Sequence, residues 1–422
     1  MNSRLILSAA ALFLGATFMS ARAGQLANTF RPLIDHPAIR YKTTPPTDPV
    51  ARLDQRLQDG AVRLSAEGPS GYLRSVLAAL DVSVDSQVVI FAKDSVQARI
   101  ISPTNPRALY FNDSVAVGWV RHGFIELAAQ DPVQGTVFYA LTPSLVGAPR
   151  IVRRHDCLTC HYSFATAGVP GMLARSSGEF AVNHTIPLER RWGGWYVTGA
   201  HGSLRHLGNV DLDRLHQSPP PQGTFNWSSF EGQFDTSGYL SPYSDVVALM
   251  VFEHQMHLMN LLTRLGWEAR VIADQGQRAD GTPATQDDEK SVSLDDGARE
   301  VVDYMLFVDE APLSDAVKGS SGFVERFERL GPYDRTGRSL RQFDLRRRLM
   351  RFPCSFLIYA PVFTSLPPQA KEAIYRRIWE VLSGADGDNK YRGLALSDRR
   401  AVVEILRDTK NDLPPYFRSS SR

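Results

Sequence analysis

Two cysteines and two histidines lie within seven positions near the middle of the chain, in the stretch RRHDCLTCHYSF, residues 153–164. Cys157, Cys160 and His161 have the spacing C-x-x-C-H, which is typical of a covalent attachment site for a c-type haem. On one turn of helix the two thiols can reach the two vinyl groups of a porphyrin, and the next residue brings an imidazole beneath the iron. We therefore expect one covalently bound haem c, with Cys157 and Cys160 as tethers and His161 as the proximal iron ligand.

The same pair of cysteines admits two other chemistries. A C-x-x-C pair is half of a structural zinc site, but the sequence holds no second Cys/His pair of matching spacing. It is also the redox pair of thioredoxin-like proteins, but the βαβ pattern expected around it is missing. Zinc and thiol chemistry remain the alternatives. The third cysteine, Cys354, lies in an apolar run and is expected to be a buried free thiol.

The five residues from Cys157 to His161 resemble the attachment motif of c-type cytochromes. Small class I members of that family carry the motif near the start of a small domain, whereas residues 24–156 precede it here, so a class I fold is not expected. The wider pattern RALYFNDSVAVGWV, RWGGWYVTGAHG, RQFDLRRRL and CSFLIY resembles a family of exported bacterial single-haem proteins described only as cytochrome c domain-containing. That resemblance implies a haem protein without an assigned substrate.

Function depends on the sixth coordination position of the iron. Strong protein ligands on both faces give an electron carrier, whereas an open or weakly held face can bind and transform a small molecule. The favoured distal ligands are His184, His201, His206 and His254. Further candidates are His257, Met172, Met256 and Met259.

A polar stripe on the helix expected after Ser241 suggests catalytic groups. Glu253, His257, Asn260 and Arg264 follow the spacing i, i+4, i+7, i+11, so they share one face of a helix that is otherwise largely apolar. If this face lines a pocket, Glu253 could orient or deprotonate His257, and Arg264 could stabilise negative charge. The alternative is an amphipathic helix whose wet face carries the same groups.

The N-terminus indicates export. Arg4, an apolar run from Leu5 to Met19 and the small-residue site ending at Ala23 are typical of a secretory signal peptide. No later segment offers ~20 consecutive apolar residues, so no integral membrane segment is expected in the mature chain. We expect the protein in the periplasm or secreted.

Charge excludes some partners. Without Arg4 and Arg22, the 47 basic residues become 45 and equal the 45 acidic residues. A neutral chain has no general electrostatic attraction to nucleic acid or to anionic membranes. The expected partner is a redox partner protein or a small-molecule substrate, with no nucleic acid.

The pattern of apolar residues predicts a predominantly helical α+β fold. Short β-branched and aromatic runs at 87–91, 108–112, 115–120, 124–129 and 136–141 predict an antiparallel meander. Helices are predicted from Asp54, over 71–82, from Ser241-Pro242 to Gly266, and over 298–310, 339–350, 368–384 and 397–410. The expected segments are a signal peptide (1–23), an N-terminal α+β segment (24–150), a central haem-binding segment (151–240) and a C-terminal helical segment (241–422).

Three functions fit these observations. The first is electron transfer by a periplasmic protein with one c-type haem. The second is a haem-dependent oxidoreductase, peroxidase-like or oxygenase-like, in which His257, Glu253 and Arg264 would act on a small molecule at the distal face. The third is a module that binds a diatomic gas at the haem.

Overall fold

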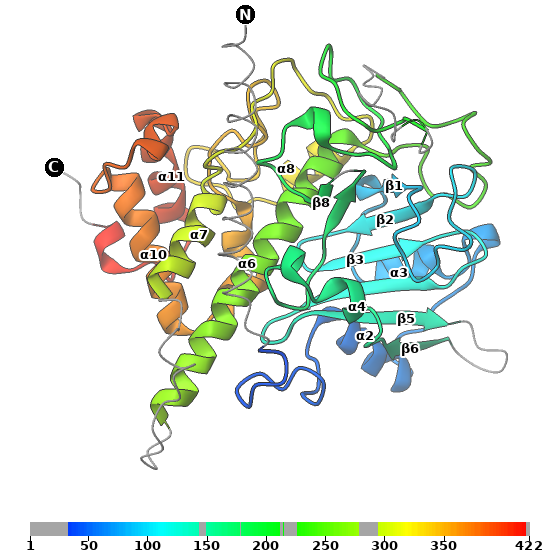
Figure 1. The fold of residues 1–422 in the computed structure, drawn as a ribbon, viewed down its shortest axis with the longest axis horizontal. Coiled ribbons are helices and arrows are strands. Elements are labelled where there is room, and N and C mark those ends of the chain that lie inside the picture. The colour runs from blue at the N-terminus through cyan, green and yellow to red at the C-terminus, as the bar shows by residue number, and fades with distance from the viewer. Residues whose placement is uncertain are drawn as a thin grey trace, which may run out of the picture.

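A computed structural model describes residues 33–142, 149–177, 179–211, 214, 226–277 and 294–418. The fold is α+β, as the sequence predicts. An antiparallel sheet from the first half of the chain lies beside a long helix, and the C-terminal helices lie on the other side of that helix (Figure 1). The predicted signal peptide lies outside the described residues.

Within the described ranges, seven antiparallel strands form the main sheet, in the order β6-β5-β4-β3-β2-β1-β9. The predicted meander is confirmed, because its five runs form five consecutive strands. The Asn112 side chain accepts hydrogen bonds from the backbone N–H groups of Ser114 and Val115 and so closes the β2–β3 turn. This explains why a polar residue lies at the end of the predicted strand. The five strands are β1 (Val88–Ile90), β2 (Arg107–Phe111), β3 (Val115–Trp119), β4 (Ile125–Asp131) and β5 (Gly135–Thr142).

Four further strands, found among the described residues, were not predicted. β6 (Arg150–Arg153) forms one edge of the main sheet and leads directly into the Cys-His stretch. β9 (Trp195–Tyr196) pairs with β1 at the other edge. β7 (Ala174–Ser176) and β8 (Glu179–Val182) form a separate two-stranded sheet.

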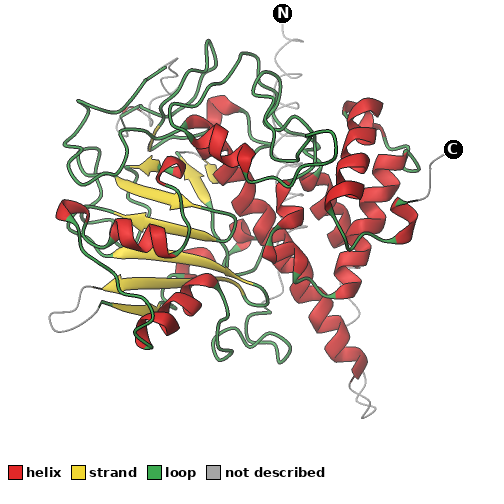
Figure 2. Ribbon diagram, turned by 180° about the vertical axis from the view of Figure 1, so that it is seen from behind, coloured by secondary structure: helices red, strands yellow, loops and turns green. Residues whose placement is uncertain are grey.

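Two helices, α2 (Pro49–Gln58) and α3 (Leu73–Ala79), cover one face of the main sheet, as the view from behind shows (Figure 2). Asp48 begins α2, because its carboxylate accepts hydrogen bonds from the N–H groups of Val50 at 2.8 Å and Ala51 at 3.0 Å. The helix therefore starts before the predicted Asp54.

The long helix α6 (Val246–Gln277) lies along the opposite face of the sheet (Figure 1). The predicted start at Ser241-Pro242 is wrong, because residue 198 pairs with residues 244–246 in extended conformation and the Asp245 carboxylate caps the first turn. The predicted stop at Gly266 is also wrong. A Cβ there would lie 3.1 Å from a Leu366 methyl group, so this glycine allows close packing inside the helix.

The C-terminal helices pack against α6 and one another. The predictions over 368–384 and 397–410 are confirmed, and the helix predicted over 298–310 begins and ends earlier. Residues 278–293 of the polar stretch between α6 and α7 lie outside the described residues. The helices are α7 (Leu294–Met305), α8 (Phe323–Arg329), α9 (Pro361–Thr364), α10 (Pro368–Ser383) and α11 (Leu396–Thr409). Single 3₁₀ turns occur at Gly68–Ser70, Val84–Ser86, Phe164–Thr166, Leu188–Arg190, Phe356–Tyr359, Asn389–Gly393 and Pro415–Phe417.

Residues 339–350 do not form the predicted helix. They form an irregular hairpin in which Asp344 accepts hydrogen bonds from the N–H groups of Arg346 and Arg347, and Leu345 has a positive φ of 54°. Arg341 is buried and pairs with Asp113 of the β2–β3 turn. These contacts to distant groups replace the solvated helix face that the arginine-rich pattern suggested.

The sheet separates two hydrophobic cores. One core lies between the sheet and α2 and α3, and the larger core joins the other sheet face to α6 and the C-terminal helices. The larger core contains Val88, Trp195 and Val246, so all three predicted segments of the mature chain contribute to it. In the part of the chain that the structure describes, no helix is long and apolar enough to cross a membrane.

Candidate functional site

The C-x-x-C-H residues form a single turn of helix, α4 (Leu158–His161), immediately after β6. The N–H group of His161 donates to the Cys157 carbonyl at 3.0 Å, which closes the turn. Arg154 holds the preceding residue, Asp156, through a 2.8 Å hydrogen bond. The local geometry is therefore the one expected from the sequence, with both thiols and the imidazole on one turn.

Cys157, Cys160 and His161 all line one cavity of about 650 Å³ between the sheet, α4 and α6. Figure 1 shows α4 and α6 on the same side of the sheet. The volume lies within the range of about 300–1,000 Å³ that is usual for ligand and cofactor sites. Most of the cavity wall is apolar, and its apolar members include Leu109, Ala116, Gly118, Ala128, Phe138, Met172, Trp195, Phe252 and Met256.

The floor of the cavity is a patch of small residues on the sheet. Ala116 of β3 lies opposite Ala128 of β4, and Gly118 is two residues further along β3 on the same face. The intervening Val115, Val117 and Trp119 face the other core and are buried there. Ala116 and Ala128 thus leave room for a flat apolar group, whereas Gly118 is covered by Glu126 and Leu109, which a Cβ there would meet at 3.1 and 3.2 Å.

The ring of His161 is fixed through one nitrogen. Nδ1 lies 2.9 Å from the Gly171 carbonyl, so Nδ1 carries a proton and donates it in this hydrogen bond. Burial lowers the pKa of His161, which favours the neutral ring. Among the described residues no hydrogen bond uses Nε2, and metal-bound histidines characteristically donate their other nitrogen in this way.

Charged side chains form the remainder of the cavity lining. Arg107 contacts Glu126 at 2.7 Å, and Ser95 donates to the same carboxylate at 2.8 Å. Burial acts to raise the pKa of Glu126, but the Arg107 charge and these hydrogen bonds outweigh it and hold the pKa below its usual range. The cations in the lining are Lys93, Arg107, Arg154 and Arg175, which could bind the carboxylates of an acidic cofactor.

The thiols do not resemble an activated redox pair. Cys157 and Cys160 are free in the structure, and burial together with the Asp156 charge raises the pKa of Cys157 to about 11. Reactive thiols in redox pairs have lowered pKa values. Within the described ranges, no group of three or more His, Cys, Asp or Glu side chains could hold a metal ion, so no zinc site is found there.

The predicted distal ligands separate into two groups. Met172 and Met256 line the cavity, and both are buried. The favoured histidines do not line it: His184 contacts His254 through their Nδ1 atoms at 2.8 Å, and His206 contacts His201 through their Nε2 atoms at 3.1 Å. Met259 and His257 are also absent from the cavity lining.

The predicted catalytic stripe lies on a different side of α6. Glu253 is buried, accepts a 2.8 Å hydrogen bond from the Trp192 indole and pairs with Arg191 at 3.4 Å. The ring of His257 packs edge-on against Tyr304, with 4.6 Å between centroids. Arg264 pairs with two carboxylates, Glu268 and Glu300. The stripe is therefore neither fully exposed to solvent nor part of the cavity wall. Of its four residues, Asn260 is the one that contacts the segment bonded to His161, because its side-chain amide donates to the Met172 carbonyl.

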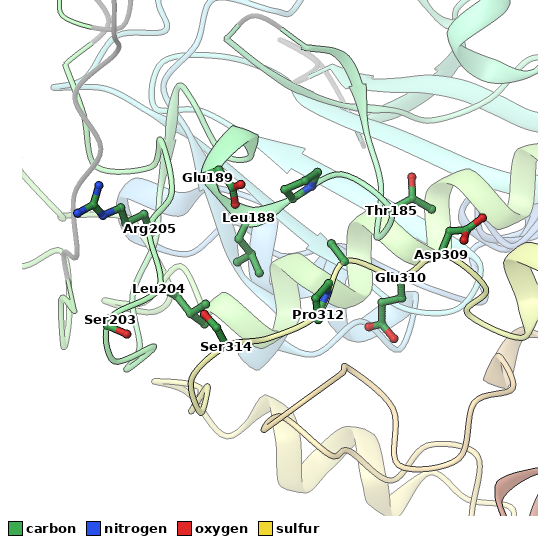
Figure 3. Close-up of a pocket in the computed structure, with 12 residues that line it drawn as sticks. Thr185, Leu188, Glu189, Ser203, Leu204, Arg205, Asp309, Glu310, Pro312 and Ser314 are labelled. Carbon is green, nitrogen blue, oxygen red and sulfur yellow. The ribbon is translucent and has the colours of Figure 1, made fainter. Parts of the chain in front are cut away.

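A second hollow, of about 750 Å³, lies outside this site (Figure 3). Its wall carries Glu189 from the 3₁₀ turn Leu188–Arg190, Arg205 from the segment after β9, and Asp309 and Glu310 from the segment after α7. Burial raises the pKa of Glu310 to about 7, and its carboxylate accepts a hydrogen bond from the Leu349 N–H. No residue of the C-x-x-C-H motif lines this hollow.

Several cavity residues were not predicted from the sequence. They include the floor residues, Phe138, Phe252 and the Arg107–Glu126 pair. The run VAVGW offered one signal, because its alternate small residues, Ala116 and Gly118, mark a sheet face that other groups can approach closely.

No match to this chain was found among protein-family models, curated proteins or solved structures. The motif and the cavity that surrounds it are therefore the features from which function can be inferred.

Proposed function

We propose that this protein carries one covalent haem c in the cavity and transfers electrons outside the cytoplasm to or from a redox partner protein. The observation that carries the proposal is the position of Cys157, Cys160 and His161, which line one cavity. The floor of small residues and the Nδ1–H bond of His161 fit a porphyrin above the sheet and an iron atom at Nε2.

Each part of the cavity has a distinct role in this proposal. When bound, the haem supplies a one-electron couple at its iron. Cys157 and Cys160 would hold the porphyrin by thioether bonds, and His161 would supply Nε2 to the iron. The propionates would be bound by cations of the lining, of which Arg107 and Arg154 already pair with Glu126 and Asp156. The apolar wall excludes water, which sets the local dielectric and so the reduction potential.

Two features support electron transfer over catalysis. The cavity wall includes two methionines, Met172 and Met256, and either thioether would be a candidate second ligand to the iron, as an electron carrier requires. The peroxidase-like or oxygenase-like alternative has less support, because His257, Glu253 and Arg264 do not line the cavity. A gas-binding module would likewise require an open position.

Covalent attachment is the first test. The full chain is produced in a bacterial periplasm together with haem c attachment proteins, and its intact mass and its spectrum in alkaline pyridine are measured. The expected result is a mass increase of one haem, its loss in Cys157→Ala/Cys160→Ala, and its retention in the matched control Cys354→Ala, which removes a buried thiol elsewhere. A wild-type chain without bound haem would overturn the proposal.

Coordination is the second test. We expect the ferric protein to be low-spin and the ferrous spectrum to be unchanged by carbon monoxide. Rapid formation of a carbon monoxide complex would instead favour the oxidoreductase or the gas-binding module.

A further inference from the structure

Three consecutive carbonyl groups behind His161 are held by three different elements. The Pro170 carbonyl accepts from the Thr136 N–H of β5 at 2.9 Å. The Gly171 carbonyl accepts from Nδ1 of His161 at 2.9 Å. The Met172 carbonyl accepts from the side-chain amide of Asn260, on α6, at 2.8 Å. The segment 170–172 therefore links the sheet, the C-x-x-C-H turn and the long helix.

Gly171 and Asn260 of α6 pack so closely that no side-chain atom fits between them. A Cβ on Gly171 would lie 2.1 Å from Oδ1 of Asn260, and Asn260 is only 2% exposed. Gly171 also donates its own N–H to the His161 carbonyl at 2.9 Å. His161 is thus joined to Gly171 at both its backbone and its ring, and Asn260 is packed against the far side of that glycine.

We propose that Asn260 is a positioning residue for the proximal histidine. By holding the Met172 carbonyl and packing against Gly171, it fixes the peptide group whose oxygen accepts the proton of Nδ1. A fixed acceptor sets the tautomer and orientation of the imidazole and strengthens Nε2 as a donor to iron. The inference rests on the proposed function for its consequence at iron, but the arrangement of Asn260, Gly171 and His161 exists without a cofactor.

The first experiment does not need haem. In the full chain carrying Cys157→Ala/Cys160→Ala, nitrogen NMR reports the tautomer of His161 and the exchange rate of its Nδ1 proton. We expect the Nδ1–H tautomer, and about threefold to tenfold faster exchange in Asn260→Ala, as for loss of one ordinary hydrogen bond. The matched control is Thr263→Val on the same helix, because Thr263 bonds to Gln130 and Met259 and to no atom of 170–172.

The second experiment uses the protein with attached haem. Asn260→Ala should raise the reduction potential, because a weaker histidine donor stabilises the ferric iron less, whereas Thr263→Val should leave it unchanged. Asn260→Ser, which keeps part of the volume but loses the reach to Met172, serves as the second variant if Asn260→Ala does not fold.

The contact itself is tested by a double variant. Gly171→Ala should disturb the His161 tautomer strongly, and adding Asn260→Ala should relieve the disturbance because it removes the clashing oxygen. If Asn260→Ala and Thr263→Val behave alike in both experiments, the positioning role is refuted. Absence of attached haem in the wild type would refute the proposed function instead, and the tautomer measurement would still decide the role of Asn260.

Discussion

Among the described residues, His161 and the His184–His254 pair lie in different surroundings, and of these three histidines only His161 lines the cavity of the C-x-x-C-H residues. His161 lies at the 650 Å³ cavity and uses one ring nitrogen for a backbone carbonyl. His184 and His254 lie among the helices, where they stack on Tyr304 and Phe307. Both ring nitrogens of His254 are hydrogen-bonded, Nδ1 to His184 and Nε2 to Ser355. The comparison teaches that a free nitrogen beside space, rather than the number of buried histidines, marks the candidate site.

The two regions also differ in what surrounds the polar groups. The cavity has a floor of alanine and glycine, whereas the helical region around Glu253 is filled by Trp192, Arg191 and stacked rings. Substitutions in the helical region should therefore lower the unfolding free energy with or without haem. Substitutions on the cavity floor should interfere mainly with haem binding.

The largest effect is expected in the helical region. Glu253→Gln leaves the buried Arg191 without its carboxylate, and removing one partner of a buried pair destabilises a protein by about 3–5 kcal/mol. The measurement is urea unfolding at pH 8, where Glu253 is charged although burial raises its pKa to about 7. Adding Arg191→Met should recover part of the loss. An unchanged unfolding free energy would show that the buried Arg191 does not depend on the Glu253 carboxylate.

A matched pair of alanines tests the difference in packing. Ala248 of α6 is fully buried in the core, so Ala248→Phe should lower the unfolding free energy by about 1–3 kcal/mol with or without haem. Ala128 lies on the cavity floor, so Ala128→Phe should have this effect only when haem competes for the space. The haem-free form is the Cys157→Ala/Cys160→Ala chain. Equal destabilisation of that form by both substitutions would mean that the floor offers no room.

The smallest expected effect is on how steeply the unfolding free energy changes with pH, and it concerns His257. Burial lowers the pKa of His257 to about 4, below its ordinary value of 6.5, so the folded state binds its proton only at lower pH than the unfolded state does. The stability that this provides is complete above pH 6.5 and is lost as pH falls towards 4. In His257→Leu, the slope of the unfolding free energy against pH should decrease by up to about 1.4 kcal/mol per pH unit.

Urea unfolding across that pH range measures the slope. The control is His122→Asn, which replaces an exposed histidine at a positive φ of 65° that asparagine also adopts. A His257→Leu curve that is parallel to the wild type would show that His257 is not buried as a neutral ring.

The sheet was predictable because alternation and turn chemistry are local. The runs that became β1 to β5 end at residues such as Asn112, whose side chain closes the turn itself. The hairpin at 339–350 was not predictable, because its conformation depends on Asp113, which is far away in sequence. The end of α6 was missed for a similar reason, since Gly266 packs against Leu366.

The sequence predicted the C-x-x-C-H side of the candidate site but not the wall that faces it. Cys157, Cys160 and His161 are adjacent in sequence, so their spacing carried the prediction. The opposite wall depends on which face of α6 meets the sheet, and that helix is apolar nearly all round. Phe252 and Met256 face the cavity, whereas Glu253 and His257 do not. The periodicity of the helix could not choose between these faces.

The order of the elements along the chain has a consequence for biogenesis. The main strands and the C-x-x-C-H turn precede α6, which supplies the wall with Phe252 and Met256 and the anchor Asn260. If the chain is exported from its N-terminus, as proposed, the sheet and both thiols would emerge before α6. Under the proposed function, attachment enzymes would reach Cys157 and Cys160 in that interval, and the later packing of α6 would close the pocket around the attached haem.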